Sequence, residues 1–229
     1  TDVQNAFRKR EFTFVLQPKC SLESGKIVGA EALARWQNAQ GVISPGAFIP
    51  FLEKSGLISE LDTYIWEAVC RWMRSMLDRG NSVVPVSVNV SRMDICAIDV
   101  PAYLNRLVEK YKLNPKLIEL EITESAYSED VDALNRIVEE LRKSGFRILM
   151  DDFGSAYSSL NILKDIAVDV IKMDMRFLQW NSSNVERGAD ILETVCNMAR
   201  ILGLGIIAEG VETEEQRNLL LNAGCACGQ

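Results

Sequence analysis

The chain has 229 residues and a formal net charge of −7, from 32 acidic and 25 basic side chains. It contains no histidine, which excludes Ser-His-Asp and Cys-His catalysis, His-ligated zinc and haem, and histidine acid–base chemistry. The acidic balance argues against a nucleic-acid polymer as partner, because such binders need a positive surface, but it allows a small phosphate ligand whose charge is met by metal ions.

Short β-rich runs alternate with longer amphipathic stretches along the chain. Several of the runs are rich in Val, Ile and Leu without polar alternation, as expected for strands buried on both faces. The predicted strands are Phe12–Leu16, Lys26–Ala34, Val83–Val90, Leu117–Ile122, Arg147–Asp151, Val168–Met173 and Gly205–Ala208.

Two amphipathic stretches show helical periodicity. Residues 129–144 predict a helix that Ser128 caps and Gly145 ends. Residues 186–202 predict a second helix, which Gly203 ends. The predicted buried stripes are Val131, Leu134, Ile137, Val138 and Leu141 in the first helix, and Ile191, Leu192, Val195, Ala199 and Leu202 in the second.

The order of these elements indicates the fold class. No Pro/Gly/Ser-rich linker divides the chain, and repeated strand–helix units imply a parallel α/β sheet, which at this length is expected to close into a barrel. The alternative is an open doubly wound sheet, which usually carries a glycine-rich phosphate loop after its first strand, and no such loop is present. Because the chain starts at Thr1, we expect residues 1–229 to be one domain of a longer protein.

Polar residues recur where the predicted strands reach their C-terminal ends. In a parallel barrel these ends meet at one rim, where chemistry collects. A single acid there is typically part of a structural ion pair, but six consecutive strands that each deliver a polar group are poorly explained in that way. The residues are Glu31, Asn89, Glu121, Asp151, Asp152, Lys172 and Glu209.

The rim offers many carboxylates and few cations, since Lys172 and Arg35 are the only obvious ones. Converging carboxylates raise one another's pKa, and a divalent cation resolves that conflict. Oxygen ligands without His or Cys point to Mg²⁺, Mn²⁺ or Ca²⁺. The adjacent Asp151 and Asp152 are compatible with two metals, because one carboxylate can bridge ions about 3.5–4 Å apart. We favour this metal site over a structural cluster of ion pairs.

Eight short sequence motifs follow one another over nearly the whole chain, and their order is informative. They are Leu16–Pro18, Ile27–Trp36, Gly41–Pro45 with Phe48-Ile49, Val88–Ser91, Glu119–Ser125, Asp151–Leu160, Val168–Asp174 and Ala208–Thr213. Together these motifs resemble the EAL-domain family of cyclic di-GMP phosphodiesterases. An isolated Glu-Ala-Leu occurs by chance in any helix, whereas the ordered set is specific.

The resemblance implies a TIM-like (β/α)8 barrel whose first strand runs antiparallel to the others. It implies hydrolysis of cyclic di-GMP to linear pGpG with Mg²⁺ or Mn²⁺, and it points to a homodimer. The ligands that it implies are Glu31, Asn89, Glu121 and Asp151 for a first ion, and Asp151, Asp152 and Glu209 for a second.

Lys172 resembles the residue that holds the attacking water or hydroxide. Asp174 lies two residues later on the same side of the strand, so it is predicted either to support Lys172 or a metal-linked water, or to form a simple ion pair. The residues on which we expect catalysis to depend are Lys172, Glu31, Asp151, Asp152 and Glu209.

Other positions match the family on the substrate side. Gln17 and Arg35 resemble substrate-side residues, with Arg35 meeting a phosphate. Glu124 resembles the glutamate that braces the loop after the paired aspartates. Glu212 and Gln229 match further rim positions, where we expect substrate contacts.

The chain departs from the family at two places. The loop after the paired aspartates reads Ser155-Ala156 where the family usually has Thr-Gly, and Ala156 adds a Cβ where glycine adopts positive φ, so turnover is expected to be sensitive to this loop. The chain also ends at Gln229, before the family's final strand and helix, so we expect a truncated C-terminal end. The missing segment either weakens closure of the barrel or is simply disordered or excluded here.

The leading hypothesis is an active phosphodiesterase. A second is a receptor that binds cyclic di-GMP without cleaving it and acts through a protein partner, but the intact set of ligands favours the enzyme. A third is a Schiff-base aldolase that uses Lys172, which leaves the carboxylates unexplained. Calcium is expected to bind and inhibit, because its loose geometry positions and activates water poorly.

The remaining expectations concern location. No apolar run is long enough to cross a bilayer and no signal sequence opens the chain, so we expect no membrane contact by this fragment, although absent domains could anchor the parent protein. The six cysteines are scattered through apolar segments, which favours free thiols in a reducing cytoplasm over a disulfide framework.

Overall fold

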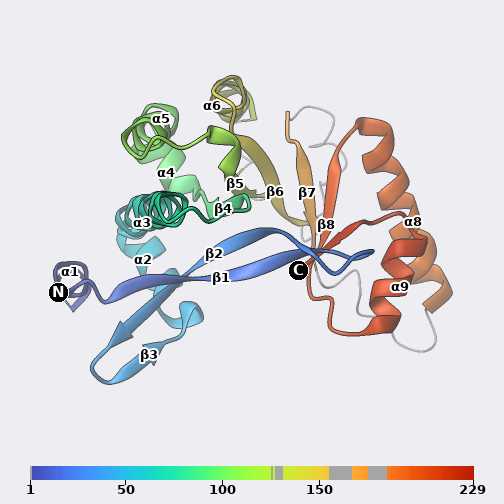
Figure 1. Ribbon diagram of the computed structural model, residues 1–229, viewed down its shortest axis with the longest axis horizontal. Helices are drawn as coiled ribbons and strands as arrows, with labels where there is room; N and C mark the ends of the chain where they lie inside the picture. Colours follow the sequence, from blue (N-terminus) through green and yellow to red (C-terminus); the bar gives the residue numbers. More distant parts are fainter. Residues whose placement is uncertain (1, 125, 127–130, 155–166, 175–184) are drawn as a thin grey trace.

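The computed structural model describes residues 2–124, 126, 131–154, 167–174 and 185–229. Within this part of the chain, nine strands form one sheet that closes on itself (Figure 1). Closure occurs because β1 (Phe12–Ser21) pairs with both β2 (Ile27–Asn38) and β9 (Cys227–Gly228). The hairpin strand β3 (Gly41–Ile43) pairs with the end of β2 and lies outside the ring. The predicted closed barrel is therefore confirmed.

Strand direction also agrees with the prediction. β1 is antiparallel to both of its neighbours, whereas the pairs from β2 and β4 round the ring to β9 are parallel. The C-terminal ends of the parallel strands consequently meet at one rim. The remaining barrel strands are β4 (Val86–Asn89), β5 (Ile118–Thr123), β6 (Arg147–Phe153), β7 (Val170–Met173) and β8 (Gly205–Ala208).

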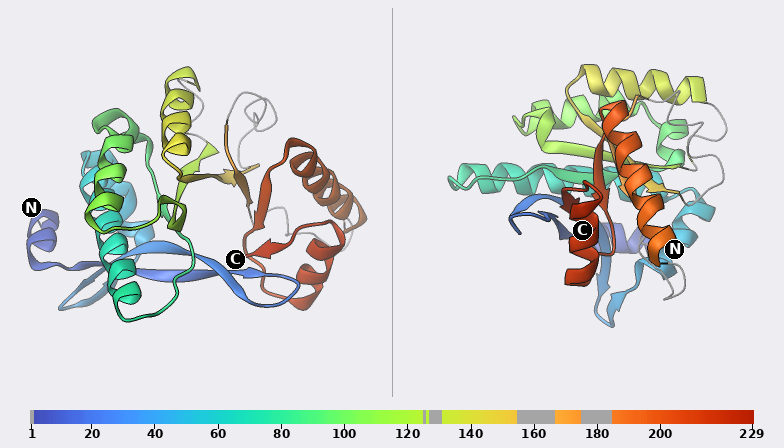
Figure 2. Two further views of the ribbon diagram at one scale, coloured as in Figure 1. Left: turned by 45° about the horizontal axis from the view of Figure 1, so that its top comes forward. Right: turned by 90° about the vertical axis from the view of Figure 1, so that its right-hand side faces the viewer.

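Helices pack on the outside of the ring, and the β1–β2 ribbon continues beyond it toward α1 and β3 (Figures 1 and 2). None of the helices in the described ranges combines the length and apolarity needed to cross a membrane. The helices are α1 (Asp2–Lys9), α2 (Pro45–Ser55), α3 (Ile58–Asp78), α4 (Arg92–Ala97), α5 (Val100–Lys110), the short 3₁₀ helix η1 (Pro115–Leu117), α6 (Val131–Lys143), α8 (Val185–Leu202) and α9 (Glu214–Asn222).

The two helices predicted from periodicity are present as α6 and α8. Gly145 and Gly203 follow them with φ of 96° and 71°, the left-handed conformation that glycine adopts without strain at a helix end. Ser128, the predicted cap of α6, lies outside the described residues.

The buried face of α8 differs from the prediction. Ile191 and Leu202 are each 48% exposed, so they do not belong to the buried stripe. Leu192 and Ala199 are fully buried as predicted, and Cys196, which was not predicted, joins them at 4% exposure. Apolar residues occupy both sides of this helix, so periodicity alone did not decide which side faces the barrel.

The closing strand β9 was not predicted, because a two-residue strand has no detectable periodicity. Cys227 and Gly228 pair in parallel with β8 and in antiparallel with β1, which corrects the expectation that the last barrel strand is missing. Gly228 is buried, and a Cβ at this position would lie 2.6 Å from Leu22 Cδ2, so only glycine fits the packing without a shift.

Part of the barrel interior is lined by polar side chains. In β4 and β5, Val, Ile and Leu alternate with Ser, Asn and Glu. The apolar side chains face the helices, and the polar ones face inward, where barrels usually carry branched apolar residues. The buried polar residues of the interior are Lys19, Glu31, Ser87, Glu119, Glu121 and Lys172.

Candidate active site

Register between strands brings the predicted rim residues together. Gln17 on β1 is aligned with Glu31 on β2, and Asn89 on β4 is aligned with Glu121 on β5. Side chains on aligned residues of neighbouring strands point to the same face of a sheet. The inward face therefore collects one polar residue after another around the rim.

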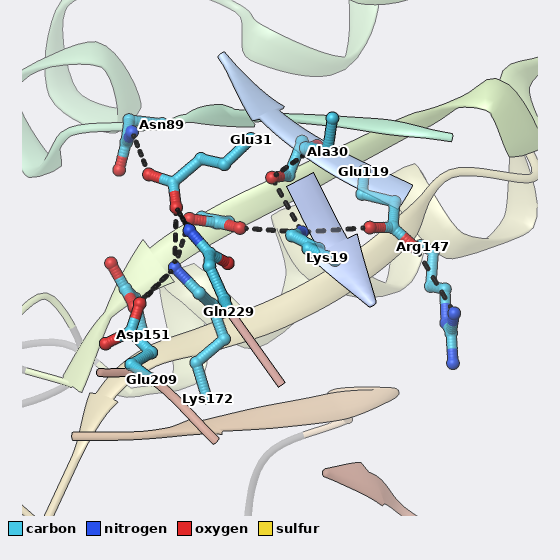
Figure 3. Close-up of polar contacts among 12 residues, drawn as sticks. Lys19, Ala30, Glu31, Asn89, Glu119, Arg147, Asp151, Lys172, Glu209 and Gln229 are labelled. Atoms are coloured by element: carbon cyan, nitrogen blue, oxygen red, sulfur yellow. Dashed lines mark hydrogen bonds and ion pairs between the residues drawn. The ribbon is translucent and has the colours of Figure 1, made fainter. Parts of the chain in front are cut away.

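The ammonium group of Lys172 lies at the centre of this cluster (Figure 3). Its side chain is 1% exposed and comes from β7. Four carboxylates surround it. The distances from Nζ are 3.1 Å to Glu31 Oε2, 2.7 Å to Glu121 Oε2, 3.0 Å to Asp151 Oδ1 and 2.8 Å to Glu209 Oε1.

Burial makes ionisation of several of these carboxylates costly. It raises the pKa of Glu31, where the neighbouring Glu121 adds to the effect, and it raises the pKa of Asp151. It also raises the pKa of Glu209 to about 7. These carboxyl groups bind their protons more strongly than exposed acids do. The cluster therefore has too little positive charge to keep all of its carboxylates ionised.

Glu121 and Lys172 stay charged for the opposite reason. Burial works against ionisation of Glu121, but Lys172 and Lys19 outweigh it and lower its pKa. Burial likewise works against the charge on Lys172, but the four carboxylates raise the pKa of the ammonium above its ordinary value. A Schiff base requires a neutral amine, so this environment argues against the aldolase hypothesis.

Lys172 cannot donate a hydrogen bond to every carboxylate around it. An ammonium group has three N–H bonds to share among four carboxylates. The buried Oδ1 of Asp151 accepts no hydrogen bond and has only its ion-pair contact with Lys172. Oxygens of Asp151, Asp152 and Glu209 lie within 4.8 Å of one another. Carboxylate oxygens gathered in this way, without His or Cys, fit a divalent cation such as Mg²⁺ or Mn²⁺.

A backbone irregularity allows both aspartates to reach the rim. In a regular strand, consecutive side chains point to opposite faces, so Asp151 and Asp152 would diverge. The pairing of β6 with β7 shifts between Met150 and Phe153, and Asp152 has φ of 57°. Bulges and left-handed non-glycine residues cost conformational energy and concentrate at functional sites. This irregularity therefore indicates that the end of β6 has a functional role in addition to its structural one.

Three polar contacts orient Glu31 and Asn89 at the rim. Asn89 Nδ2 donates to Glu31 Oε1 at 3.3 Å, and Gln229 Nε2 donates to Glu31 Oε2 at 2.5 Å. Trp66 donates from Nε1 to the backbone oxygen of Asn89 at 2.9 Å. Gln229 therefore joins the cluster directly after the closing strand.

Glu124 contacts the loop that follows β6. Its Oε2 accepts a hydrogen bond from the backbone N–H of Gly154 at 3.2 Å, and its side chain is buried. Gly154 follows the paired aspartates and Phe153, so this contact has the geometry of a brace. The Ser155-Ala156 change lies outside the described residues.

Two further predicted residues, Glu212 and Asp174, come after the ends of β8 and β7. Glu212 is exposed, and its backbone N–H donates to Gln216 Oε1 at 2.7 Å at the start of α9. Asp174 is 9% exposed but is not among the four carboxylates in contact with Lys172.

A cavity of about 640 Å³ opens beside the carboxylates. Its walls include Arg35, Asn89, Asp151 and Asp152, so the predicted phosphate contact and the candidate metal ligands share one space. The volume falls within the range of small-molecule sites. Arg35 Nη1 donates to the backbone oxygen of Ala34 at 2.8 Å.

A buried carboxyl pair in the cavity region was not predicted. Asp62, on the cavity wall, is 9% exposed, and its hydrogen-bond partner Asp94 is fully buried. Ser91 donates from its backbone N–H and from its hydroxyl to Asp94 Oδ2, both at 2.7 Å. Burial raises the pKa of Asp62 well above its ordinary value, and Asp94 adds to the shift. Asp62 and Asp94 are far apart in sequence, so no local pattern revealed the pair.

The chain is similar to proteins of known family over its whole length. The family described as EAL domain matches residues 1–229. MucR of Pseudomonas aeruginosa, named a bifunctional diguanylate cyclase/cyclic di-GMP phosphodiesterase, is 36% identical over 225 residues. PdeB of Escherichia coli, named a probable cyclic di-GMP phosphodiesterase, is 35% identical over 228 residues. These alignments cover 98% and 99% of this chain but only 33% of MucR and 43% of PdeB.

Solved structures agree with these relatives. The structure described as PaMucR phosphodiesterase in complex with c-di-GMP is 35% identical and superposes with a TM-score of 0.91. The match covers 100% of this chain and 92% of that chain. The barrel and its rim therefore have a counterpart that was solved with c-di-GMP bound.

Replacing Lys172 with Met tests the charge balance of the cluster. The substitution leaves the surrounding carboxylates without their cation, so the free energy of unfolding of the metal-free protein should fall by about 3–5 kcal/mol. Because a bound cation compensates, Mn²⁺ should raise the melting temperature of the variant more than that of the unmodified protein. Thermal unfolding in chelator and in Mn²⁺ measures both effects.

The control is Lys143→Met, which removes an exposed i,i+4 ion pair with Glu139. Exposed pairs of this kind contribute little, so both melting curves should remain unchanged. Equal Mn²⁺-induced shifts in Lys172→Met and in the unmodified protein would contradict the charge argument.

Replacing Asp62 with Asn tests the buried carboxyl pair. The pKa of Asp62 is raised in the folded protein, so folding favours the protonated acid. The free energy of unfolding should therefore fall as pH rises from the ordinary aspartate value of 3.8 through the raised folded pKa. Asn has no proton to lose, so the stability of Asp62→Asn relative to the unmodified protein should grow with pH.

Urea unfolding at a series of pH values measures this difference. Asp78→Asn, an exposed change on the same helix, controls for the general effect of a lost charge. A stability difference between Asp62→Asn and the unmodified protein that stays constant with pH would show that Asp62 is not held protonated by the fold.

Proposed function

The chain belongs to the EAL domain family, and we propose that it hydrolyses cyclic di-GMP to linear pGpG. The observation that carries the proposal is the gathering of Glu31, Glu121, Asp151 and Glu209 around Lys172 beside a ligand-sized cavity. MucR and PdeB, which bear cyclic di-GMP phosphodiesterase names, support the substrate class. The alternative is a receptor that binds this nucleotide without cleaving it.

The candidate metal ligands follow from the oxygens of the rim. Mg²⁺ or Mn²⁺ bound there would supply Lewis acidity, which neutralises phosphodiester charge and acidifies water. Asp151 Oδ1 lies 3.0 Å from Lys172 Nζ but accepts no hydrogen bond from the described residues, which supports the assignment of Asp151 as the shared ligand of two ions. The proposed ligands are Glu31, Asn89, Glu121 and Asp151 for the first ion, and Asp151, Asp152 and Glu209 for the second.

The reaction is an in-line displacement at one of the two phosphates of the ring. A P–O bond forms to the oxygen of water while the bond to the ribose 3′-oxygen breaks, so the opened product ends in a 5′-phosphate and a 3′-hydroxyl. Lys172, held protonated by its carboxylates, is a donor that orients the attacking water. Glu209 Oε1 lies 2.8 Å from Lys172 Nζ, so this carboxylate helps to keep the donor protonated and in place.

The substrate-side roles are assigned by position. Arg35 lies on the cavity wall, where its guanidinium meets a phosphate of the substrate. Gln17 is exposed and aligned with Glu31 on the neighbouring strand, which supports contact with substrate above the metal ligands. Glu124 keeps the loop after β6 in place through Gly154. We assign Gln229 to the orientation of Glu31, and Glu212 and Asp174 to outer positions.

The setting of the protein forms part of the proposal. The cysteines Cys20, Cys70, Cys96, Cys196, Cys225 and Cys227 are free, which supports a reducing compartment such as the cytoplasm. MucR and PdeB are much longer than this chain, which supports its role as one domain of a multidomain signalling protein. Assembly into a homodimer rests on the family resemblance.

Asp151→Asn provides the direct test of hydrolysis. With cyclic di-GMP and Mn²⁺, the unmodified chain should release pGpG, which anion-exchange chromatography separates from the substrate. The variant should be slower by more than about a hundredfold, because a ligand that stabilises charge in the transition state is worth several kcal/mol. Asp132→Asn, an exposed change on α6, is the control and should turn over normally. Tight binding of cyclic di-GMP without pGpG would favour the receptor instead.

Calcium tests the metal assignment independently. Ca²⁺ has flexible coordination, so it should occupy the carboxylates without positioning water for attack. Added to the Mn²⁺-dependent reaction, it should lower the rate progressively, and excess Mn²⁺ should restore it. A reaction that proceeds at full rate with Ca²⁺ alone would contradict the assignment.

A further inference from the structure

A second buried lysine lies below the rim. Lys19 on β1 is 2% exposed, and no role on the rim requires it. Figure 3 shows it beside Glu119 and Arg147, away from the group around Lys172. We propose that Lys19 is a positioning residue that holds Glu121 in the orientation needed for a divalent cation; the proposal rests on the metal site of the proposed function.

Each of the two lysines donates a hydrogen bond to a different oxygen of the Glu121 carboxylate. Lys19 Nζ donates to Oε1 at 3.0 Å, and Lys172 Nζ donates to Oε2 at 2.7 Å. Glu121 is 1% exposed, so water cannot replace either contact. Rotation of the carboxylate would break both charge-assisted hydrogen bonds in a dry interior. Its two oxygens therefore have fixed and different roles.

Lys19 is itself held in place. Its Nζ also donates to Ser87 Oγ at 2.7 Å and to Glu119 Oε2 at 3.2 Å, so all three N–H bonds of the ammonium have acceptors. Arg147 Nη1 in turn donates to Glu119 Oε1 at 3.2 Å. A cavity of about 180 Å³ lined by these charged residues lies at the end of the barrel opposite the rim. Lys19 is thus held by a hydrogen-bond network in which each of its N–H bonds has an acceptor. The network reaches the surface at Arg147.

Lys19 and Lys172 therefore affect metal binding by Glu121 in different ways. Lys172 occupies Oε2, the oxygen on the side of the other rim carboxylates, and so competes with a cation for it. Lys19 occupies only Oε1 and stabilises the ionised carboxylate without covering Oε2. Groups that orient a metal ligand from behind typically change metal affinity 10- to 100-fold when they are removed.

The double variant Lys19→Met/Glu119→Gln tests the proposal. It removes one positive and one negative charge, so the net charge of the interior is kept and Glu119 is not left as a second bare carboxylate beside Glu121. Calorimetric titration of the metal-free protein with Mn²⁺ should show affinity reduced by about 10- to 100-fold. This readout needs no turnover, so it succeeds or fails separately from hydrolysis.

Turnover gives a second readout that a merely structural role would not move. The Mn²⁺ concentration for half-maximal rate should rise by a similar factor, while the rate at saturating Mn²⁺ stays within about threefold of the unmodified protein. Simple loss of folded protein would lower the maximal rate and leave that concentration unchanged.

Two single variants complete the test. Arg147→Met alters the exposed end of the network without touching Glu121, so Mn²⁺ affinity should stay within about threefold. Ser87→Ala keeps every charge but removes an acceptor of Lys19 that is also a hydrogen-bond partner of Glu121, so it should weaken Mn²⁺ binding measurably; it also tests the network around Glu121 if the double variant does not fold. Unchanged Mn²⁺ affinity in a folded double variant, or in Ser87→Ala when the double variant is unfolded, would overturn the proposal.

Discussion

Inside the barrel, the buried carboxylates outnumber the positive charges beside them, and the other features of the site follow from this imbalance. Lys172 faces Glu31, Glu121, Asp151 and Glu209 at once, and its three N–H bonds cannot satisfy four carboxylates, even though Lys19 shares Glu121. Unpaired charge in a buried site is costly, so such a cluster persists only with shared protons, a further cation or both. Two consequences of this one deficit are the raised pKa values of three of these acids and the Oδ1 of Asp151, which has an ion-pair contact with Lys172 but accepts no hydrogen bond from the described residues.

The fold makes this concentration of charge possible through three local features. Two-residue periodicity turns the apolar side chains of β4 and β5 toward the helices and their polar ones inward. The shift in pairing at the end of β6 adds Asp152 beside Asp151. The antiparallel β1 approaches from the opposite direction and brings Lys19 into the interior below Glu121. A regular parallel barrel would offer the rim acids without the cation behind them.

Much of the rim could be predicted because parallel strands share one direction, so the ends of predicted strands locate residues such as Glu31 and Asp151 without further information. That reasoning does not locate Lys19, whose strand runs the other way, or Asp62, whose partner Asp94 is distant in sequence. It also missed β9, which is held by its pairing with β1 and β8 and not by its own sequence pattern. Long-range pairing and backbone direction, unlike periodicity, are not encoded in any short window.

The claim that these oxygens require divalent cations can be measured without any reaction. Electron paramagnetic resonance distinguishes free Mn²⁺, which gives a sharp six-line signal, from bound Mn²⁺, whose signal is broadened. Added to metal-free protein, about two equivalents of Mn²⁺ should lose the sharp signal, and Asp151→Asn should restore much of it. A sharp signal that grows from the first addition of Mn²⁺ to folded, chelator-free protein would contradict the account.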